Sequence, residues 1–286
     1  MIFATGDIHG NPTRFSADSF PEQKEMTKDD YVVVLGDFGL VWNVGEESKT
    51  EKHWLDWLEK RPFTTLFVDG NHENFDRLNA YPVEEWHGGK VQKIRPSVIH
   101  LMRGEIYDIG GAKCLAFGGA PSHDIRGLAT EAELAENYAA GIIDPEDPDA
   151  LYKIKKLDQM ERDGIFCPYR VKGISWWHEE LPSEEEMDNA RKNLATSNYK
   201  VDYVFSHDGP SSSIAIGWGG AFKPNKQTRF LEEIRSDLQY RAWLFGHYHE
   251  DRRVAEKEIV LYTQIVQVWE GAEQEFQESS EKGKRL

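Results

Sequence analysis

Cysteine is scarce in this chain, and basic residues are outnumbered by acidic ones. Only Cys114 and Cys167 occur among 286 residues, and 34 Lys and Arg side chains stand against 50 Asp and Glu, giving a formal net charge of −16. Two cysteines leave a single disulfide open but do not make the disulfide framework of a small secreted domain. The negative field repels polyanions, so long nucleic acid is not an expected partner.

Long apolar runs are also missing. No segment approaches the roughly 20 apolar residues that span a bilayer, so no membrane partner is predicted. The N-terminus does not resemble a signal peptide, because Met1 leads directly into a short apolar run, and we therefore expect a cytoplasmic protein. The length suits one α/β domain, expected at residues 1–270, with a charged, flexible tail at 271–286.

Five short motifs rich in Asp, Asn and His occur along the chain, and each follows an apolar run that is typical of a buried strand. The runs are MIFAT, YVVVL, TTLFV, VDYVF and AWLF. The motifs are GDIHG with Asp7 and His9, GDFG with Asp37, GNHE with Asn71 and His72, SHDGP with His207, and GHYH with His247 and His249. Because loops at the ends of strands converge in space, this order predicts a metal site assembled from distant parts of the sequence.

The spacing of apolar residues predicts sheets covered by helices. Residues 46–60 form an expected amphipathic helix that ends before Pro62, and residues 97–119 contain three short runs that predict an antiparallel meander. Residues of about 121–195 differ in character and predict a helical insertion near the site entrance, anchored on the core by Trp176 and Trp177. The strand pattern resumes from residue 200.

The residue types in the motifs favour two metal ions. If the backbone is extended, residues two apart point to the same side, so Asp7 with His9 and His247 with His249 can each reach one ion. Asp37 has two carboxylate oxygens and can bridge two ions. With Asn71 and His207 the set has seven oxygen and nitrogen ligands, too many for one tetrahedral zinc, and it has no thiolate.

His72 follows Asn71 directly and faces away from it if the chain is extended there. It is therefore the candidate general acid, or a positive charge beside the leaving oxygen. Two cations about 3.5–4 Å apart can clamp the attacking and leaving oxygens of an in-line displacement and deprotonate a bound water.

The ordered set of motifs resembles the calcineurin-like metallophosphoesterase superfamily, and GDIHG and GNHE resemble its Ser/Thr phosphatase and dinucleoside tetraphosphatase branch. The resemblance implies an α/β fold, a four-layer αββα sandwich of two mixed sheets, with two divalent metal ions at the strand ends. Mn is the first choice, with Fe, Zn, Co or Ni as alternatives. The first ion would take Asp7, His9, Asp37 and His249, the second would take Asp37, Asn71, His207 and His247, and His72 would be catalytic.

The chain departs from the family pattern in two places. The second motif usually reads GDxxDRG, but here Leu40 and Val41 occupy the positions of the second Asp and the Arg, which leaves the partner of His72 unassigned. The Arg expected shortly after GNHE is also absent. The candidates for binding phosphate are Arg14, Arg77, Arg126 and Arg170, and the Gly-rich turn with His123 and Arg126 is a further candidate for facing the substrate.

These features together predict a dimetal phosphoesterase that hydrolyses phosphate esters by attack of metal-bound hydroxide. The first hypothesis is a phosphomonoesterase acting on a phosphoprotein or a small phosphorylated metabolite. The alternatives are a phosphodiesterase or nuclease, and a metal-binding scaffold without catalysis. The sequence leaves the substrate, the native metal and the oligomeric state open.

Overall fold

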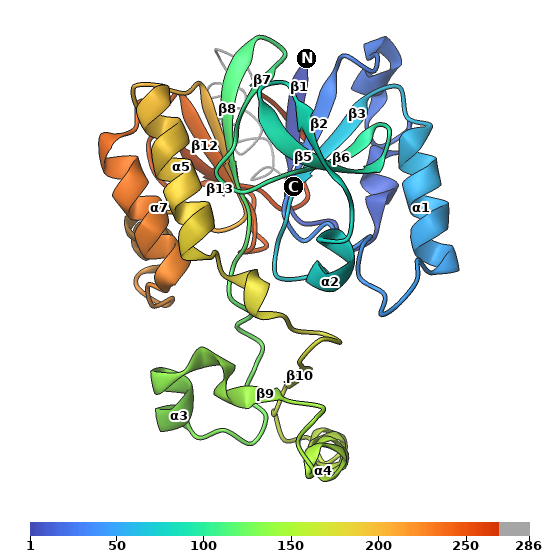
Figure 1. Cartoon of the computed structure of the whole chain (residues 1–286), viewed down its shortest axis with the longest axis vertical. Helices are drawn as coiled ribbons and strands as arrows, with labels where there is room; N and C mark the ends of the chain where they lie inside the picture. Colours follow the sequence, from blue (N-terminus) through green and yellow to red (C-terminus); the bar gives the residue numbers. More distant parts are fainter. Residues whose placement is uncertain (269–286) are drawn as a thin grey trace, which may run out of the picture.

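The computed structural model describes residues 1–268, and the tail predicted at 271–286 lies outside the described residues. Within this range two mixed sheets pack face to face (Figure 1). The first sheet has, in spatial order, the strands β15 (Val266–Gln267), β1 (Ile2–Thr5), β2 (Tyr31–Leu35), β3 (Thr64–Val68), β6 (Val98–Leu101), β5 (Gly89–Arg95) and β4 (Val83–Trp86). Strands β1, β2, β3 and β6 are parallel to one another.

The second sheet repeats this arrangement, with four parallel strands and antiparallel edges. Its strands are, in spatial order, β13 (Arg252–Arg253), β14 (Glu258–Val260), β12 (Ala242–Phe245), β11 (Tyr203–Ser206), β8 (Ala112–Phe117) and β7 (Ile106–Ile109). Strands β14, β12, β11 and β8 are the parallel ones.

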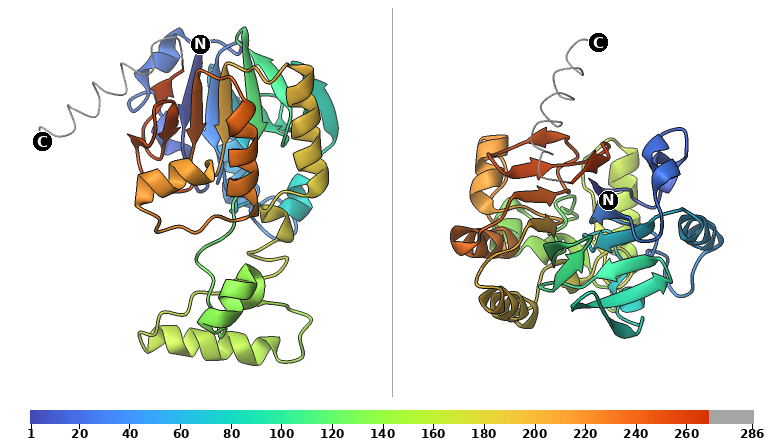
Figure 2. Two further views of the ribbon diagram at one scale, coloured as in Figure 1. Left: turned by 90° about the vertical axis from the view of Figure 1, so that its left-hand side faces the viewer. Right: turned by 90° about the horizontal axis from the view of Figure 1, so that it is seen from above.

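Both faces of each sheet are buried, which explains the continuous apolar runs. In β2, Val33 and Leu35 point into the core between the sheets, whereas Val32 and Val34 pack on the outer side. Helix α1 (Lys49–Glu59) covers the outer face of the first sheet, and α5 (Glu184–Thr196), α6 (Ser211–Trp218) and α7 (Lys226–Asp237) cover that of the second. Figure 2 shows these four layers from above. The predicted αββα sandwich is confirmed.

Helix α1 shows how the local sequence sets an element. Ser48 accepts the backbone N–H of Glu51, and the Glu51 side chain accepts the N–H of Ser48 in return, so the helix begins at Lys49 and not at residue 46. Leu55 and Leu58 are fully buried against the sheet. The remaining short helices of the body are α2 (Phe75–Leu78) and the 3-10 helices η1 (Pro12–Phe15) and η2 (Pro21–Glu25), and η4 (His178–Glu180) lies in the segment that re-enters the body near residue 182.

The predicted meander at residues 97–119 is wrong in its pairing. Strand β6 joins the first sheet beside β3, whereas β7 and β8 form a hairpin at the edge of the second sheet. The chain crosses between the sheets next to Arg103, whose guanidinium binds the Asp69 carboxylate in the interior. Alternating apolar residues identify a strand but carry no information about the sheet that it joins.

Residues 121–182 form a lobe that stands apart from the two sheets, below them in Figure 1. It contains α3 (Glu131–Glu136), η3 (Tyr138–Gly141), β9 (Ile142–Ile143), α4 (Ala150–Arg162) and β10 (Arg170–Val171). Leu157, Cys167 and Val171 belong to a small core of its own. Helix α5, which falls within the predicted insertion at 121–195, instead packs on the second sheet.

The lobe joins the body through a narrow neck. The backbone N–H of Ser122 donates to the Glu180 carboxylate at 2.9 Å, so the two connecting segments touch each other. Trp177 fixes the neck to the first sheet, because its indole N–H donates to Asp76 at 2.8 Å and its ring lies in the outer core. Trp177 is therefore the anchor that the sequence predicts, whereas Trp176 packs against Tyr138 inside the lobe.

Two further expectations are settled by this structure. Cys114 and Cys167 are both buried free thiols, so the disulfide left open by the sequence is not formed. Among residues 1–268, no helix has the length and apolarity required to cross a bilayer.

Candidate metal centre

The loops that follow five parallel strands meet at one end of the sandwich. Strands β1, β2 and β3 supply GDIHG, GDFG and GNHE from the first sheet, and β11 and β12 supply SHDGP and GHYH from the second. Hydrogen bonds join the two halves: His207 Nδ1 donates to the Leu35 carbonyl at 2.8 Å, and the His247 backbone N–H donates to Asp7 Oδ1 at 3.0 Å. The first of these bonds orients the His207 ring. This bond turns His207 Nε2 toward Asp37 Oδ1 and Asn71 Oδ1, each at 3.3 Å. The second shell of a metal-binding histidine has this form.

A first cluster of ligand atoms contains Asp7, His9 and His249. The Nε2 atoms of His9 and His249 are 3.0 Å apart, and His249 Nε2 lies 3.2 Å from Asp7 Oδ2. This Asp7 oxygen is buried and accepts no hydrogen bond from any residue in the range 1–268. A buried carboxylate oxygen without a donor, faced by two imidazole nitrogens, fits a divalent cation.

Asp37 connects this cluster to a second one. Its Oδ1 lies 3.3 Å from His207 Nε2, and its Oδ2 lies 3.8 Å from His9 Nδ1. The two oxygens therefore face different sides of the site, an arrangement that would allow the carboxylate to be shared by two cations. Asp7, Asp37 and His207 form a compact set of ligand atoms, all of them buried.

Asn71 and His247 complete the second side. Asn71 donates its amide N–H to the Ser122 hydroxyl at 3.3 Å, which leaves its oxygen facing His207. The His247 ring lies edge-on to the rings of His207 and His123, each at 4.9 Å between centroids. His247 lies outside the compact sets of ligand atoms found in residues 1–268, whereas His72 belongs to one of them, with His9 and Asp37. The contacts of Asn71 and His247 with His207 place these two residues beside the other predicted ligands.

The backbone does not reach these positions in the way that the spacing suggests. His9, Asp37, His247 and His249 have φ angles of 43°, 44°, 69° and 51°, in the left-handed region that residues other than glycine rarely occupy. The assumption of extended chain at Asp7–His9 and His247–His249 is therefore wrong. Such strained conformations concentrate at functional sites, where the surrounding structure holds them.

Two glycines are required by the packing around the ligands. A Cβ on Gly36, whose φ is 91°, would lie 2.1 Å from His207 Nδ1. A Cβ on Gly70 would lie 2.1 Å from Asp37 Oδ1. The motif glycines thus allow the buried ligands to approach the neighbouring backbone closely.

Charge in the buried site is concentrated on Asp37 and His207. Burial alone would raise the pKa of Asp37, but His207, His72 and His9 hold it well below the usual range. Against the opposing effect of burial, the carboxylates of Asp37 and Asp7 raise the pKa of His207 to about 10. Burial and the neighbouring His207 lower the pKa of His247 well below its usual value. The buried carboxylates therefore favour positive charge beside them, and bound cations would supply it.

His72 lies at the edge of the site and is turned toward it, not away from it. Its Nε2 is 3.9 Å from Asp37 Oδ2 and 3.3 Å from Arg170 Nη2, and its ring packs on Trp42 at 5.4 Å. Leu40, at the position where the family has its second Asp, is buried in the outer core. Burial lowers the pKa of His72.

Sequence reasoning missed two buried carboxylic acids that hold the ligand loops. Glu73 accepts the backbone N–H of Phe38 at 2.8 Å, which ties the GNHE loop to the GDFG loop, and burial raises its pKa well above the usual value. Asp208 accepts the Tyr248 hydroxyl at 2.6 Å and so ties SHDGP to GHYH. Glu73 and Asp208 lie inside the GNHE and SHDGP motifs, and this position within the motifs is the sequence feature that could have identified them.

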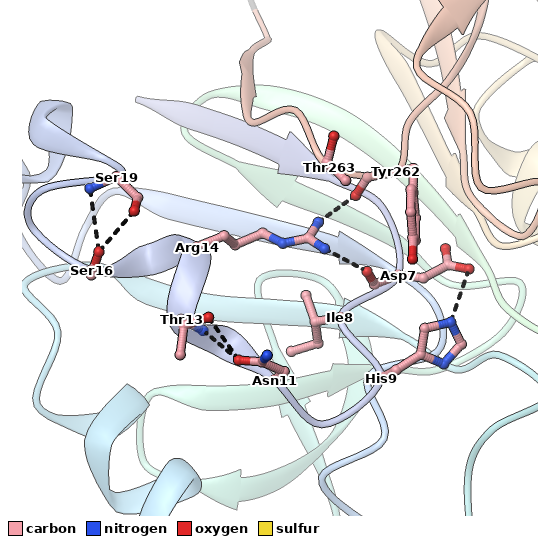
Figure 3. Close-up of a pocket in the computed structure, with 10 residues that line it drawn as sticks. All are labelled: Asp7, Ile8, His9, Asn11, Thr13, Arg14, Ser16, Ser19, Tyr262 and Thr263. Atoms are coloured by element: carbon pink, nitrogen blue, oxygen red, sulfur yellow. Dashed lines mark hydrogen bonds and ion pairs between the residues drawn. The ribbon is translucent and has the colours of Figure 1, made fainter.

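An open cavity of about 670 Å³ adjoins Asp7 and His9. Figure 3 shows its lining, which includes Thr13, Ser16, Ser19 and Thr263. Arg14 also lies there, but its guanidinium donates to the carbonyls of Asp7 and Tyr262. The cavity therefore has a mostly polar lining next to the ligand cluster, and the donors of Arg14 are used by backbone carbonyls.

Comparison with protein families and with curated proteins agrees with this geometry. Residues 1–251 match the family model of the calcineurin-like phosphoesterases. Lariat debranching enzyme A of Xenopus laevis is 26% identical over 138 residues, which cover 44% of this chain and 24% of that protein. The match thus spans about a quarter of the relative.

This chain belongs to the calcineurin-like phosphoesterase family. The predicted superfamily is confirmed, whereas the branch, the metal and the type of ester stay predictions.

Proposed function

We propose that this phosphoesterase hydrolyses phosphate monoesters, either of small phosphorylated metabolites or of phosphoproteins, with two divalent cations. Asp7, His9, Asp37 and His249 would hold the first cation, and Asp37, Asn71, His207 and His247 the second. The observation that carries the proposal is the position of Asp37, whose two oxygens face His9 on one side and His207 on the other.

Two cations bound there would supply the nucleophile from water and neutralise charge on the phosphoryl oxygens. The chain's own residues position the substrate around them. His72 stands half-buried at the lip of the site, where its Nε2 can hold a proton for the leaving oxygen. The polar cavity beside Asp7 and His9 offers room for the alcohol part of the ester.

Manganese is our first choice of metal, because it is bound well by carboxylate, amide and imidazole ligands, and the predicted set contains no soft thiolate. We place the enzyme in the cytoplasm, since its two cysteines are free thiols inside separate cores. Both choices belong to the proposal.

A phosphodiesterase or nuclease is the second candidate function. The relative named as a lariat debranching enzyme favours it. The net charge of −16 weighs against long polynucleotides, because a strongly acidic surface repels them. An inactive scaffold is disfavoured by the gathering of all seven predicted ligands.

The deciding experiment compares p-nitrophenyl phosphate with bis-p-nitrophenyl phosphate as substrates. The protein is stripped of metal and reloaded with Mn²⁺, and the metal content is measured beside kcat/KM. Faster monoester hydrolysis supports the proposal, and faster diester hydrolysis replaces it with the second candidate. Bound metal without hydrolysis of either ester would contradict both.

A further inference from the structure

The lobe brings a positive charge to the metal centre. Arg170 begins β10 in the lobe, and its Nη2 lies 3.3 Å from Nε2 of His72, a residue of the body. The side chain is only 12% exposed, although it spans the gap between the two parts of the chain. A guanidinium held at the edge of a carboxylate-rich site is available to a bound anion.

The backbone of Arg170 is fixed by the lobe. Arg170 pairs with Ile142 in the parallel ladder of β9 and β10, and the next residue, Val171, enters the small core. The carbonyl of Pro168, two residues earlier, accepts the backbone N–H groups of Arg126 and Gly127. The position of Arg170 therefore follows from the fold of the lobe.

The guanidinium itself is held on one side and free on the other. Asp124 accepts from Nε at 3.3 Å and also from Nη2, which fixes the plane of the group. Nη1 has no hydrogen-bond partner among residues 1–268, and it carries two of the five N–H donors of an arginine. The group thus has donors to spare for phosphate oxygens.

The three other arginine candidates are engaged elsewhere. Arg14 donates to the carbonyls of Asp7 and Tyr262, and Arg77 donates to the Glu51 carboxylate and the Asn43 carbonyl. Arg126 is paired with Glu131. Of the four candidates in the sequence, Arg170 is the one whose guanidinium contacts a side chain of the metal centre, since Arg14 meets only the backbone carbonyl of Asp7 there.

We propose that Arg170 is a phosphoryl-binding residue supplied by the lobe, which donates to a non-bridging oxygen of a phosphate monoester lying beside His72. This inference rests on the proposed function and narrows it. A monoester presents one more terminal oxygen than a diester, and the planar fork of Arg170 matches that group. Asp124 is the positioning residue that holds the guanidinium.

The test uses the full chain loaded with Mn²⁺ and compares Arg170→Ala with two further variants. Lys172→Ala is the matched control, because Lys172 is a cation of the same lobe that is paired with Asp144 and exposed. Arg170→Lys keeps the positive charge but lacks the planar guanidinium with its paired donors. If the alanine variant does not fold, the comparison of Arg170→Lys with the wild type still tests the inference. The readouts are inorganic phosphate binding by titration calorimetry, kcat/KM for p-nitrophenyl phosphate, Mn²⁺ content and Tm.

Arg170→Ala should weaken phosphate binding by roughly tenfold or more and lower kcat/KM by roughly 100-fold, with Mn²⁺ content unchanged. Arg170→Lys should fall between the alanine variant and the wild type, and Lys172→Ala should match the wild type. Equal phosphate affinity of wild type and both Arg170 variants would overturn the inference.

The calorimetry also separates this inference from the proposed function. If the wild type binds Mn²⁺ but hydrolyses no monoester, the proposed function fails. Phosphate binding that still depends on Arg170 would then support the phosphoryl site alone, and binding that does not depend on it would overturn the site as well.

Discussion

Replacing Glu180 with glutamine should make the stability of the metal-free protein less sensitive to pH. Glu180 closes the neck of the lobe and is fully buried. One carboxylate oxygen accepts the backbone N–H of Ser122, and the other has no hydrogen-bond partner in residues 1–268. Burial raises the pKa of this carboxyl from 4.5 to about 8, although the bonds from Ser122 oppose the change.

The sign follows from the protons bound in each state. Between pH 4.5 and about 8 the folded carboxyl keeps its proton while the unfolded one has released it. The stability associated with the neutral carboxyl is thus complete below pH 4.5 and is lost as the pH rises toward 8. At about 1.4 kcal/mol per pH unit, the loss is at most on the order of 5 kcal/mol. Glutamine cannot ionise, so the Glu180→Gln variant does not lose this stability as the pH rises.

The assay is urea unfolding followed by tryptophan fluorescence, on metal-free wild type and Glu180→Gln, at several values between about pH 4.5 and 8. The free energy of unfolding of the variant relative to the wild type should increase steadily with pH. The difference near pH 4.5 serves as the control, because it reports the packing effect of the amide alone. A difference that stays constant up to pH 8 would refute the reasoning.

Three further substitutions test the site and the neck. Asp37→Asn should remove metal from both positions and lower kcat/KM by about 100-fold or more, because the shared charge is lost; full Mn²⁺ content by mass spectrometry would contradict the shared role. His72→Ala should lower kcat by about 10²–10⁴-fold with Mn²⁺ retained, and loss of Mn²⁺ would make His72 a ligand instead. Trp177→Phe keeps the ring but loses the bond to Asp76, so it should destabilise the fold by about 1 kcal/mol and speed proteolysis of the lobe; unchanged cleavage would argue against the anchor.

The sequence predicts the buried strands and the loops after them because both signals are local. An apolar run such as YVVVL is buried on both faces of its sheet, and a glycine followed by Asp37 marks where it ends. The αββα layers and the gathering of the ligands follow from these local signals together with the family resemblance.

The remaining features depend on tertiary contacts. The pattern of apolar residues at 98–101 does not determine which sheet this strand joins. The contact between Arg170 and His72 depends on the position of the lobe relative to the two sheets. The left-handed backbone at His9 and Asp37 costs energy locally, so no local pattern favours it. Such a conformation is held only by bonds from elsewhere, for example the bond between the His9 N–H and the Asp37 carbonyl at 2.9 Å.

The narrow neck has a consequence for how such an enzyme can diversify. The chain leaves and re-enters the sandwich at two points joined by the hydrogen bond between Ser122 and Glu180, and five ligand-bearing loops lie outside the segment between them. Recombination at these two points would replace the whole lobe, including Arg170, by another inserted segment. The hydrolytic centre would be inherited intact while the group that meets the substrate is replaced, so selection can act on the two separately.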